Sequence, residues 1–164
     1  MTAAQCALVV VAIAAGLSSG AQFMEHVLGL APCPLCLMQR IWVMIAGAVA
    51  LIALVDRPTR VGYPLLTVAA ALAGAGFAIR QLYLQSLPPD AIPACGPDLG
   101  YLFEAFPFKD VLKAMTFGTG DCAQVMKVLG VNIATWSLLG FLALIATGAF
   151  WVRSARRAAV PRPG

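Results

Sequence analysis

Residues His26-Val27-Leu28-Gly29-Leu30-Ala31-Pro32-Cys33-Pro34-Leu35-Cys36-Leu37-Met38-Gln39-Arg40 join two long apolar runs of the sequence. A short connection of this kind predicts a tight loop at a membrane surface, provided that both runs cross the membrane. The connection contains a Cys-x-x-Cys pair, and Arg40 follows the second cysteine by four residues. The fold and the chemistry of the chain both depend on what lies on either side of this stretch.

The composition is that of a protein embedded in lipid. Hydrophobic residues make up 61% of the 164-residue chain and charged residues 11%. A typical soluble domain has roughly 25% charged residues. A soluble fold of this length could not bury so much apolar surface. The sequence therefore predicts an integral membrane protein.

Four apolar segments are long enough to cross a hydrocarbon core about 30 Å thick. They cover residues 4–24, 37–55, 61–85 and 131–152. Backbone polar groups in lipid must be hydrogen-bonded within the segment, so all four are predicted to be helices. We expect an all-α integral membrane protein, a four-transmembrane-helix bundle that forms a single domain over residues 1–164.

The first apolar segment has a second interpretation. It ends in Ser19-Gly20-Ala21, a run of small residues that a signal peptidase could accept. No basic residue precedes the segment, and its apolar run is longer than an ordinary signal-peptide core. We therefore expect a retained membrane span. Its removal would leave the orientation of the other spans unchanged.

Basic residues predict the orientation, because cytoplasmic loops of membrane proteins are enriched in lysine and arginine. Six of the eleven Lys and Arg residues fall between the second and third spans or after the fourth: Arg57, Arg60, Arg153, Arg156, Arg157 and Arg162. We expect both termini in the cytoplasm and the other two loops, residues 25–36 and 86–130, on the periplasmic side. The net charge of +4 is then mostly a signal of topology, and nothing indicates a nucleic-acid partner.

The long periplasmic loop is the only sizeable hydrophilic segment of the sequence. Within residues 106–117, apolar side chains recur at helical spacing, namely Phe108, Val111, Leu112 and Met115. This pattern predicts a short amphipathic interfacial helix that lies on the outer leaflet. The following Gly118-Thr119-Gly120 is expected to end that helix and to form a flexible hinge before Asp121 and Cys122.

Four of the five cysteines fall on the predicted periplasmic side, and the fifth, Cys6, lies at the start of the first span. Disulfides persist in the bacterial periplasm. Four cysteines allow three connectivities. One close pair and two distant partners favour Cys33–Cys36 and Cys95–Cys122. Cys6 is expected to be only a small hydrophobic residue.

The paired sulfur atoms have three interpretations. Both disulfides could staple loops, although a Cys-x-x-Cys ring restrains too little chain for stability to explain Cys33–Cys36. A metal site with His26 is the second, but no second tight pair or third ligand follows at the spacing that zinc sites use. The third is redox chemistry, which suits exposed and exchangeable sulfur. We favour redox chemistry and expect no bound metal.

The surroundings of the close pair support this preference. The second span begins at the pair, so the positive end of its helix dipole points at the sulfur atoms and favours thiolate. Arg40 lies one helical turn beyond Cys36 on the same face. Its charge could stabilise a Cys36 thiolate or the oxygen of a reduced acceptor, although an arginine at this depth also fits lipid headgroups. A disulfide here would lie within reach of a lipid-soluble electron acceptor.

Five short motifs together resemble one known family. They are Glu25-His26, Pro32-Cys33-Pro34-Leu35-Cys36, Gln39-Arg40, Cys95-Gly96-Pro97 and Gly120-Asp121-Cys122-Ala123. Their order, with the span order and the loop lengths, is similar to DsbB, the bacterial inner-membrane enzyme that reoxidises the periplasmic dithiol oxidase DsbA. The resemblance covers nearly the whole chain.

This resemblance implies a quinone-dependent protein-dithiol oxidoreductase that sustains disulfide formation in exported proteins. It implies that Cys33 and Cys36 face the quinone, either ubiquinone or menaquinone, and that Cys95 and Cys122 meet a DsbA-like thioredoxin-fold oxidase. The implied catalytic residues are these four cysteines and Arg40. The candidates for contact with quinone are Arg40, Cys36 and His26. The resemblance places His26, Arg80 and Gln81 near where the family holds quinone, and no essential role is assigned to these three.

Two other functions fit the same residues. A quinone enzyme similar to vitamin K epoxide reductase would share the chemistry but use another helix arrangement. A membrane transporter or sensor that binds metal through cysteine and histidine is the non-enzyme alternative.

Overall fold

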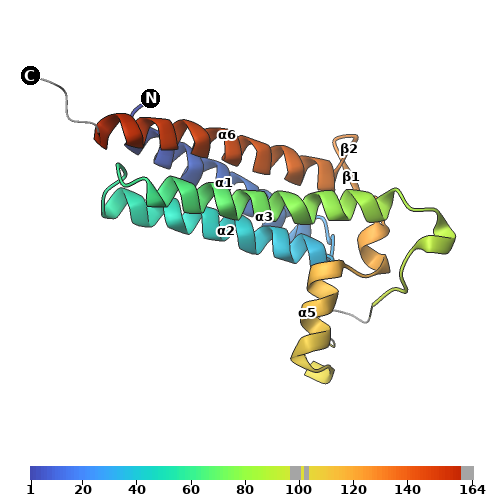
Figure 1. Cartoon of the computed structure of the whole chain (residues 1–164). Helices are drawn as coiled ribbons and strands as arrows, with labels where there is room; N and C mark the ends of the chain where they lie inside the picture. Colours follow the sequence, from blue (N-terminus) through green and yellow to red (C-terminus); the bar gives the residue numbers. More distant parts are fainter. Residues whose placement is uncertain (97–100, 102–103, 160–164) are drawn as a thin grey trace, which may run out of the picture.

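A computed structural model describes residues 1–96, 101 and 104–159 of the chain. Within these residues, four helices are long and apolar enough to cross a membrane. They are α1 (Ala3–His26), α2 (Pro34–Val55), α3 (Gly62–Gln85) and α6 (Ile133–Ala159). Figure 1 shows them side by side as one bundle. The predicted four-helix membrane fold is confirmed.

Small residues hold the bundle together. Each helix packs against two neighbours, in the cyclic order α1, α2, α3, α6. Gly74 of α3 lies against the ring of Phe141 of α6, and Gly47 of α2 lies against Ala14 of α1. Most other residues of the bundle core are alanines. Small side chains let helix backbones approach closely in lipid, where apolar burial alone does not favour association.

The start of α2 differs from the expected span. The predicted span begins at residue 37, whereas α2 begins at Pro34. The reason is local: the Cys33 sulfur accepts a hydrogen bond from the Cys36 backbone N–H at 3.4 Å and so caps the helix. Proline is favoured at the first helical position, where its missing N–H is not needed. Cys36 therefore lies inside the first turn of α2, and the connection to α1 is shorter than predicted.

The two ends of the bundle carry different groups. At one end, the Trp151 indole N–H donates to the Pro58 carbonyl at 2.8 Å, and the Ser154 hydroxyl donates to the Met1 carbonyl at 3.1 Å. This end therefore gathers the start of α1, the end of α6 and the turn between α2 and α3 (Figure 1). These segments carry most of the arginines that predict a cytoplasmic side. Arg162, which contributes to that prediction, lies outside the described residues. The other end carries the cysteine pairs.

The predicted amphipathic helix is present as α5 (Phe108–Phe117). Its Val111 and Met115 are buried against the first turns of α2, whereas Phe108 and Leu112 are exposed. Figure 1 shows α5 running across the direction of the bundle helices. This is the placement expected of an interfacial helix.

The rest of the long loop forms short elements at the same end of the bundle. They are η1 (Pro89–Ala91), η2 (Gly120–Ala123), β1 (Lys127–Val128) and β2 (Val131–Asn132). The strands pair antiparallel around Leu129 and Gly130, both with positive φ. This two-residue turn matches the right-handed twist of the strands. Pro97 and Asp98, which belong to the same predicted loop, lie outside the described residues.

The segment from Gly118 to Gly120 is not the open hinge that its glycines predict. A Cβ at Gly118, whose φ is +79°, would lie 2.8 Å from Leu35 and 2.9 Å from Leu84. A Cβ at Gly120 would overlap the Pro93 carbonyl oxygen. Both glycines are needed for close packing, and the segment is held against the bundle.

Candidate functional site

Three sulfur atoms come together at the N-terminus of α2. The Sγ atoms of Cys33 and Cys36 are 2.8 Å apart, and Cys122 forms a buried cluster with Cys33 and Leu35. All five cysteines of the chain are present as thiols. The close pair is therefore in contact with a cysteine that lies more than eighty residues away in the sequence. This contact brings the two predicted pairs together.

The surroundings of Cys122 favour its thiolate form. It is fully buried in η2. A hydrogen bond from the Cys33 thiol, followed by backbone N–H groups, lowers the pKa of Cys122 to about 6 despite burial. A thiolate is the form of cysteine that attacks a disulfide, and a low pKa also makes it a good leaving group.

Cys95 is exposed to solvent, in contrast to buried Cys122. Its segment is fastened to η2 by two hydrogen bonds: Gly120 N–H donates to the Ala94 carbonyl, and Gly96 N–H donates to the Asp121 carboxylate, both at 3.1 Å. Because Gly120 has no side chain, the two segments can approach this closely. A hydrogen bond with the Asp121 carboxylate also raises the pKa of the Cys95 thiol.

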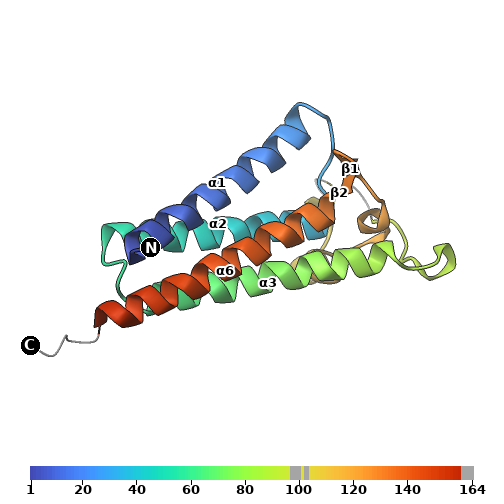
Figure 2. The ribbon, with the colours of Figure 1, turned by 90° about the horizontal axis from the view of Figure 1, so that it is seen from above.

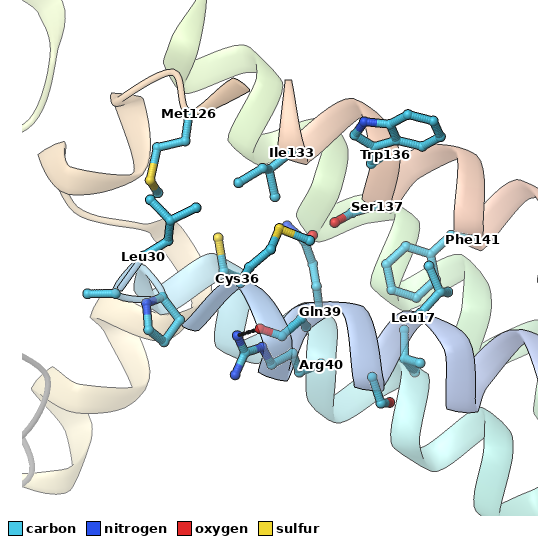
Figure 3. A pocket seen from close by; sticks show the side chains of 16 residues that line it. Leu17, Leu30, Cys36, Gln39, Arg40, Met126, Ile133, Trp136, Ser137 and Phe141 are labelled. Carbon is cyan, nitrogen blue, oxygen red and sulfur yellow. Dashed lines mark hydrogen bonds between the residues drawn. The ribbon is translucent and has the colours of Figure 1, made fainter. Parts of the chain in front are cut away.

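An apolar cavity opens on the other side of the close pair. It is lined by α1, the connection to α2, the first turns of α2, Met126 and the start of α6. Figure 2 shows α1 diverging from α6 toward this end of the bundle. The Cys36 sulfur points into the cavity, and Trp136 and Phe141 form its far wall (Figure 3). Gln39 and Arg40 are among its polar lining residues, together with Ser18 and Ser137.

Arg40 is held at the edge of this cavity by α1. Its guanidinium pairs with the Glu25 carboxylate and donates to the Ala21 carbonyl at 2.9 Å. The side chains of Arg40 and Glu25 are 20% and 29% exposed, so water screens the pair only in part. The arginine is thus fixed in direction toward the cavity, and is not free to follow lipid headgroups.

Comparisons with known proteins identify the family of this chain. The family model described as "Disulfide bond formation protein DsbB" matches residues 3–151. The chain belongs to the DsbB family. A relative from Hahella chejuensis, named disulfide bond formation protein B, is 48% identical over 147 residues, which are 87% of this chain and 89% of the relative. Relatives of the same name from Saccharophagus degradans and Chromobacterium violaceum are 44% and 42% identical, over 87% and 92% of this chain and 88% and 92% of their own length.

As a DsbB family member with four apolar spans, the protein is a multi-pass membrane oxidoreductase that forms disulfide bonds. The family assignment rests on residues 3–151, which are most of the chain. The roles of the individual cysteines and of Arg40 remain predictions, as do the two disulfide connectivities.

Other residues predicted from the sequence lie away from the sulfur atoms. His26 is exposed at the end of α1 and does not line the cavity, so its contact with a cofactor stays a prediction. Arg80 donates to the Phe117 carbonyl at 3.3 Å and lies over the ring of Tyr83. Cys6 is buried among the helices at the opposite end of the bundle.

Three residues of this site have contacts that the sequence does not predict. Glu25 is the ion-pair partner of Arg40, although the sequence placed it only beside His26. Gln39 and Gln81 are buried and hydrogen-bonded to each other, and Gln81 also contacts the sulfur atoms of the close pair. A polar side chain within an apolar span was an available signal, because such residues are rare in lipid and are usually functional.

The contact between Asp121 and Cys95 predicts a pH effect. Asp121→Asn removes the negative charge that raises the pKa of Cys95. Alkylation of Cys95 in the reduced protein should therefore reach half of its maximal rate at a lower pH than in the wild type. The measurement is the rate of iodoacetamide labelling of the Cys95 peptide against pH, with Asp110→Asn on α5 as the control. An unchanged or upward-shifted profile would contradict the assigned contact.

Proposed function

We propose that the protein carries electrons from a reduced DsbA-like protein, through two sulfur pairs, to quinone dissolved in the membrane. One observation supports this above all others. Cys122 packs against Cys33 behind the close pair, while Cys36 faces the apolar cavity. The sulfur atoms thus form a series that begins at exposed Cys95 and ends at a lipid-facing cavity.

In the first proposed step, a thiolate of the partner attacks Cys95. The Cys95–Cys122 bond breaks, the partner is joined to Cys95, and Cys122 leaves as a thiolate. The exposure of Cys95 and the burial of Cys122 support this direction of attack. The low pKa of Cys122 also favours it as the leaving group.

In the second step, the Cys122 thiolate attacks Cys33, which is already in contact with it. The Cys33–Cys36 bond breaks and Cys36 is released as a thiolate. The partner's second thiolate then displaces Cys95, and Cys95 attacks Cys122 to restore the loop disulfide and release Cys33. The partner has lost two electrons, and the Cys33–Cys36 pair has gained them.

The residues around the cavity fit a quinone. Its walls are mostly apolar, and a cysteine sulfur and an arginine guanidinium reach it. When bound, a quinone would accept two electrons and two protons and leave as a hydroquinone. Cys36 would present its sulfur, Arg40 would stabilise negative charge on an oxygen, and the apolar side chains would exclude water.

We further infer that the protein lies in the bacterial inner membrane with both termini in the cytoplasm. Arg57 and Arg60 lie in the turn at the same end of the bundle as Arg153, Arg156 and Arg157. This asymmetry supports a cytoplasmic location for that end. The four outer cysteines are then periplasmic.

Anaerobic mixing tests the proposal. Purified protein is combined with a reduced DsbA-type protein and either a ubiquinone or a menaquinone analogue, and quinone absorbance is followed. We expect one quinone to be reduced for each partner dithiol oxidised, with no turnover when either is omitted. Dithiol oxidation that proceeds without quinone would contradict the proposal. Stoichiometric zinc or copper that disappears in Cys33→Ser would instead favour the metal transporter.

A further inference from the structure

Two buried glutamines lie next to the close sulfur pair, where α2 packs against α3. Gln39 and Gln81 are 4% and 3% exposed. Burial of an amide is unfavourable unless its N–H and carbonyl groups find partners. The partners that these amides take therefore indicate what they do.

Each amide has a defined partner. Gln39 Nε2 donates to Gln81 Oε1 at 2.8 Å. Gln81 Oε1 also accepts a longer hydrogen bond from the Cys36 thiol at 3.7 Å, and the Gln81 Nε2 atom is turned toward the sulfur pair. The Gln81 Nε2 atom lies 3.3 Å from the Cys36 sulfur and 3.6 Å from the Cys33 sulfur. One amide thus donates toward both members of the pair.

An amide donor does not treat the two redox states alike. A hydrogen bond to an ionised acceptor is roughly twice as strong as one to a neutral acceptor. A disulfide sulfur is neutral and accepts weakly, whereas a thiolate carries a full charge. In surroundings with little water, this difference is larger than it would be at the surface. The Gln81 N–H groups therefore favour the reduced pair with its charge on Cys36.

We propose that Gln81 is a catalytic residue that stabilises the Cys36 thiolate, and that Gln39 is the positioning residue that orients it. When a protein dithiol reduces the pair, the S–S bond takes up two electrons. The dithiol becomes a disulfide and gives up two protons, of which Cys33 takes one and solvent the other, and Cys36 keeps its negative charge facing Gln81. This inference rests on the proposed function, because it assigns the thiolate to the cysteine that lines the cavity.

The reduction equilibrium of the Cys33–Cys36 pair tests the inference. Full-length wild type, Gln81→Leu and Gln39→Leu are equilibrated in dithiothreitol buffers of graded redox ratio. Each sample is quenched in acid and alkylated, and the Cys33–Cys36 peptide is quantified by mass spectrometry. The matched control is Gln85→Leu, one turn further along α3, whose amide donates to the Gln124 carbonyl and does not reach the sulfur atoms.

We expect Gln81→Leu to shift this equilibrium about tenfold toward the disulfide, equivalent to about 30 mV for two electrons. Gln39→Leu should shift it in the same direction by less, and Gln85→Leu should leave it unchanged. Alkylation of reduced Cys36 at pH 7 by a membrane-permeant reagent should also slow in Gln81→Leu. A merely structural role would not move the equilibrium in this one direction.

An equilibrium within twofold of the wild type in folded Gln81→Leu would overturn the inference, and so would a shift toward the dithiol. If Gln81→Leu does not fold, Gln81→Asn replaces it, because a side chain shorter by one methylene withdraws the donor but stays polar. The same outcomes then decide. The measurement needs neither quinone nor partner. The redox equilibrium of the Cys33–Cys36 pair can therefore be compared between variants even if the proposed function is wrong.

Discussion

Cys36→Ser is expected to abolish quinone reduction while the protein stays folded in the membrane. The Cys36 sulfur is the one that points into the cavity, and serine can neither form the disulfide nor supply electrons. Turnover should fall by at least about a thousandfold, since loss of an essential nucleophile has effects of that size or larger. The assay is anaerobic quinone reduction driven by a reduced DsbA-type protein.

The chain offers its own control for this variant. Cys6 is equally a cysteine in a helix, but it is buried at the other end of the bundle. Cys6→Ser should retain turnover near the wild-type value. Near-normal quinone reduction by Cys36→Ser would overturn the assignment of the close pair. A large loss in Cys6→Ser would mean that the assay reports on packing and not on electron transfer.

Arg40→Met is expected to raise the quinone concentration needed for half-maximal rate by about ten- to a hundredfold. A hydrogen bond to a charged group contributes about 1.5–3 kcal/mol, which corresponds to that range of affinity. The concentration of the dithiol partner needed for half-maximal rate should not change. Steady-state assays that vary each substrate in turn separate the two effects. A half-saturating quinone concentration within twofold of the wild type would contradict the role of Arg40.

Glu25 allows the charge of Arg40 to be separated from its orientation. Arg40→Met leaves the Glu25 carboxylate without its partner, which could itself disturb the cavity. The double variant Glu25→Gln/Arg40→Met removes that charge, so a defect that persists belongs to Arg40. Glu25→Gln alone keeps the guanidinium and its bond to Ala21, and we expect it to weaken quinone use less than Arg40→Met.

Much of the fold could be predicted because it depends on local properties of the chain. Apolar runs of the length of the bilayer give the four spans, and the spacing of Val111 and Met115 gives α5. The start of α2 could not be placed in the same way. It depends on the Cys33 sulfur acting as a helix cap, a role that cysteine seldom takes.

Only those residues of the site that lie close together in the sequence could be predicted. Spacing identifies Cys33, Cys36 and Arg40, because they lie within two turns of one helix. The contact between Gln39 and Gln81 joins residues 42 positions apart, and it exists only because α2 packs against α3. The contact of Cys122 with Cys33 depends in turn on how the loop folds over the bundle. Nothing in the sequence around Cys122 encodes that distance.

Gly118 determines how closely the turn that carries Cys122 can pack against the helix bundle. Its backbone fits between Leu35 and Leu84 because no side chain occupies that space, and its positive φ suits glycine. Any bulkier residue would wedge the Cys122 turn away from the bundle. Such a protein would still span the membrane and bind its partners. Electrons, however, could no longer pass from its water-side sulfur atoms to its lipid-side ones.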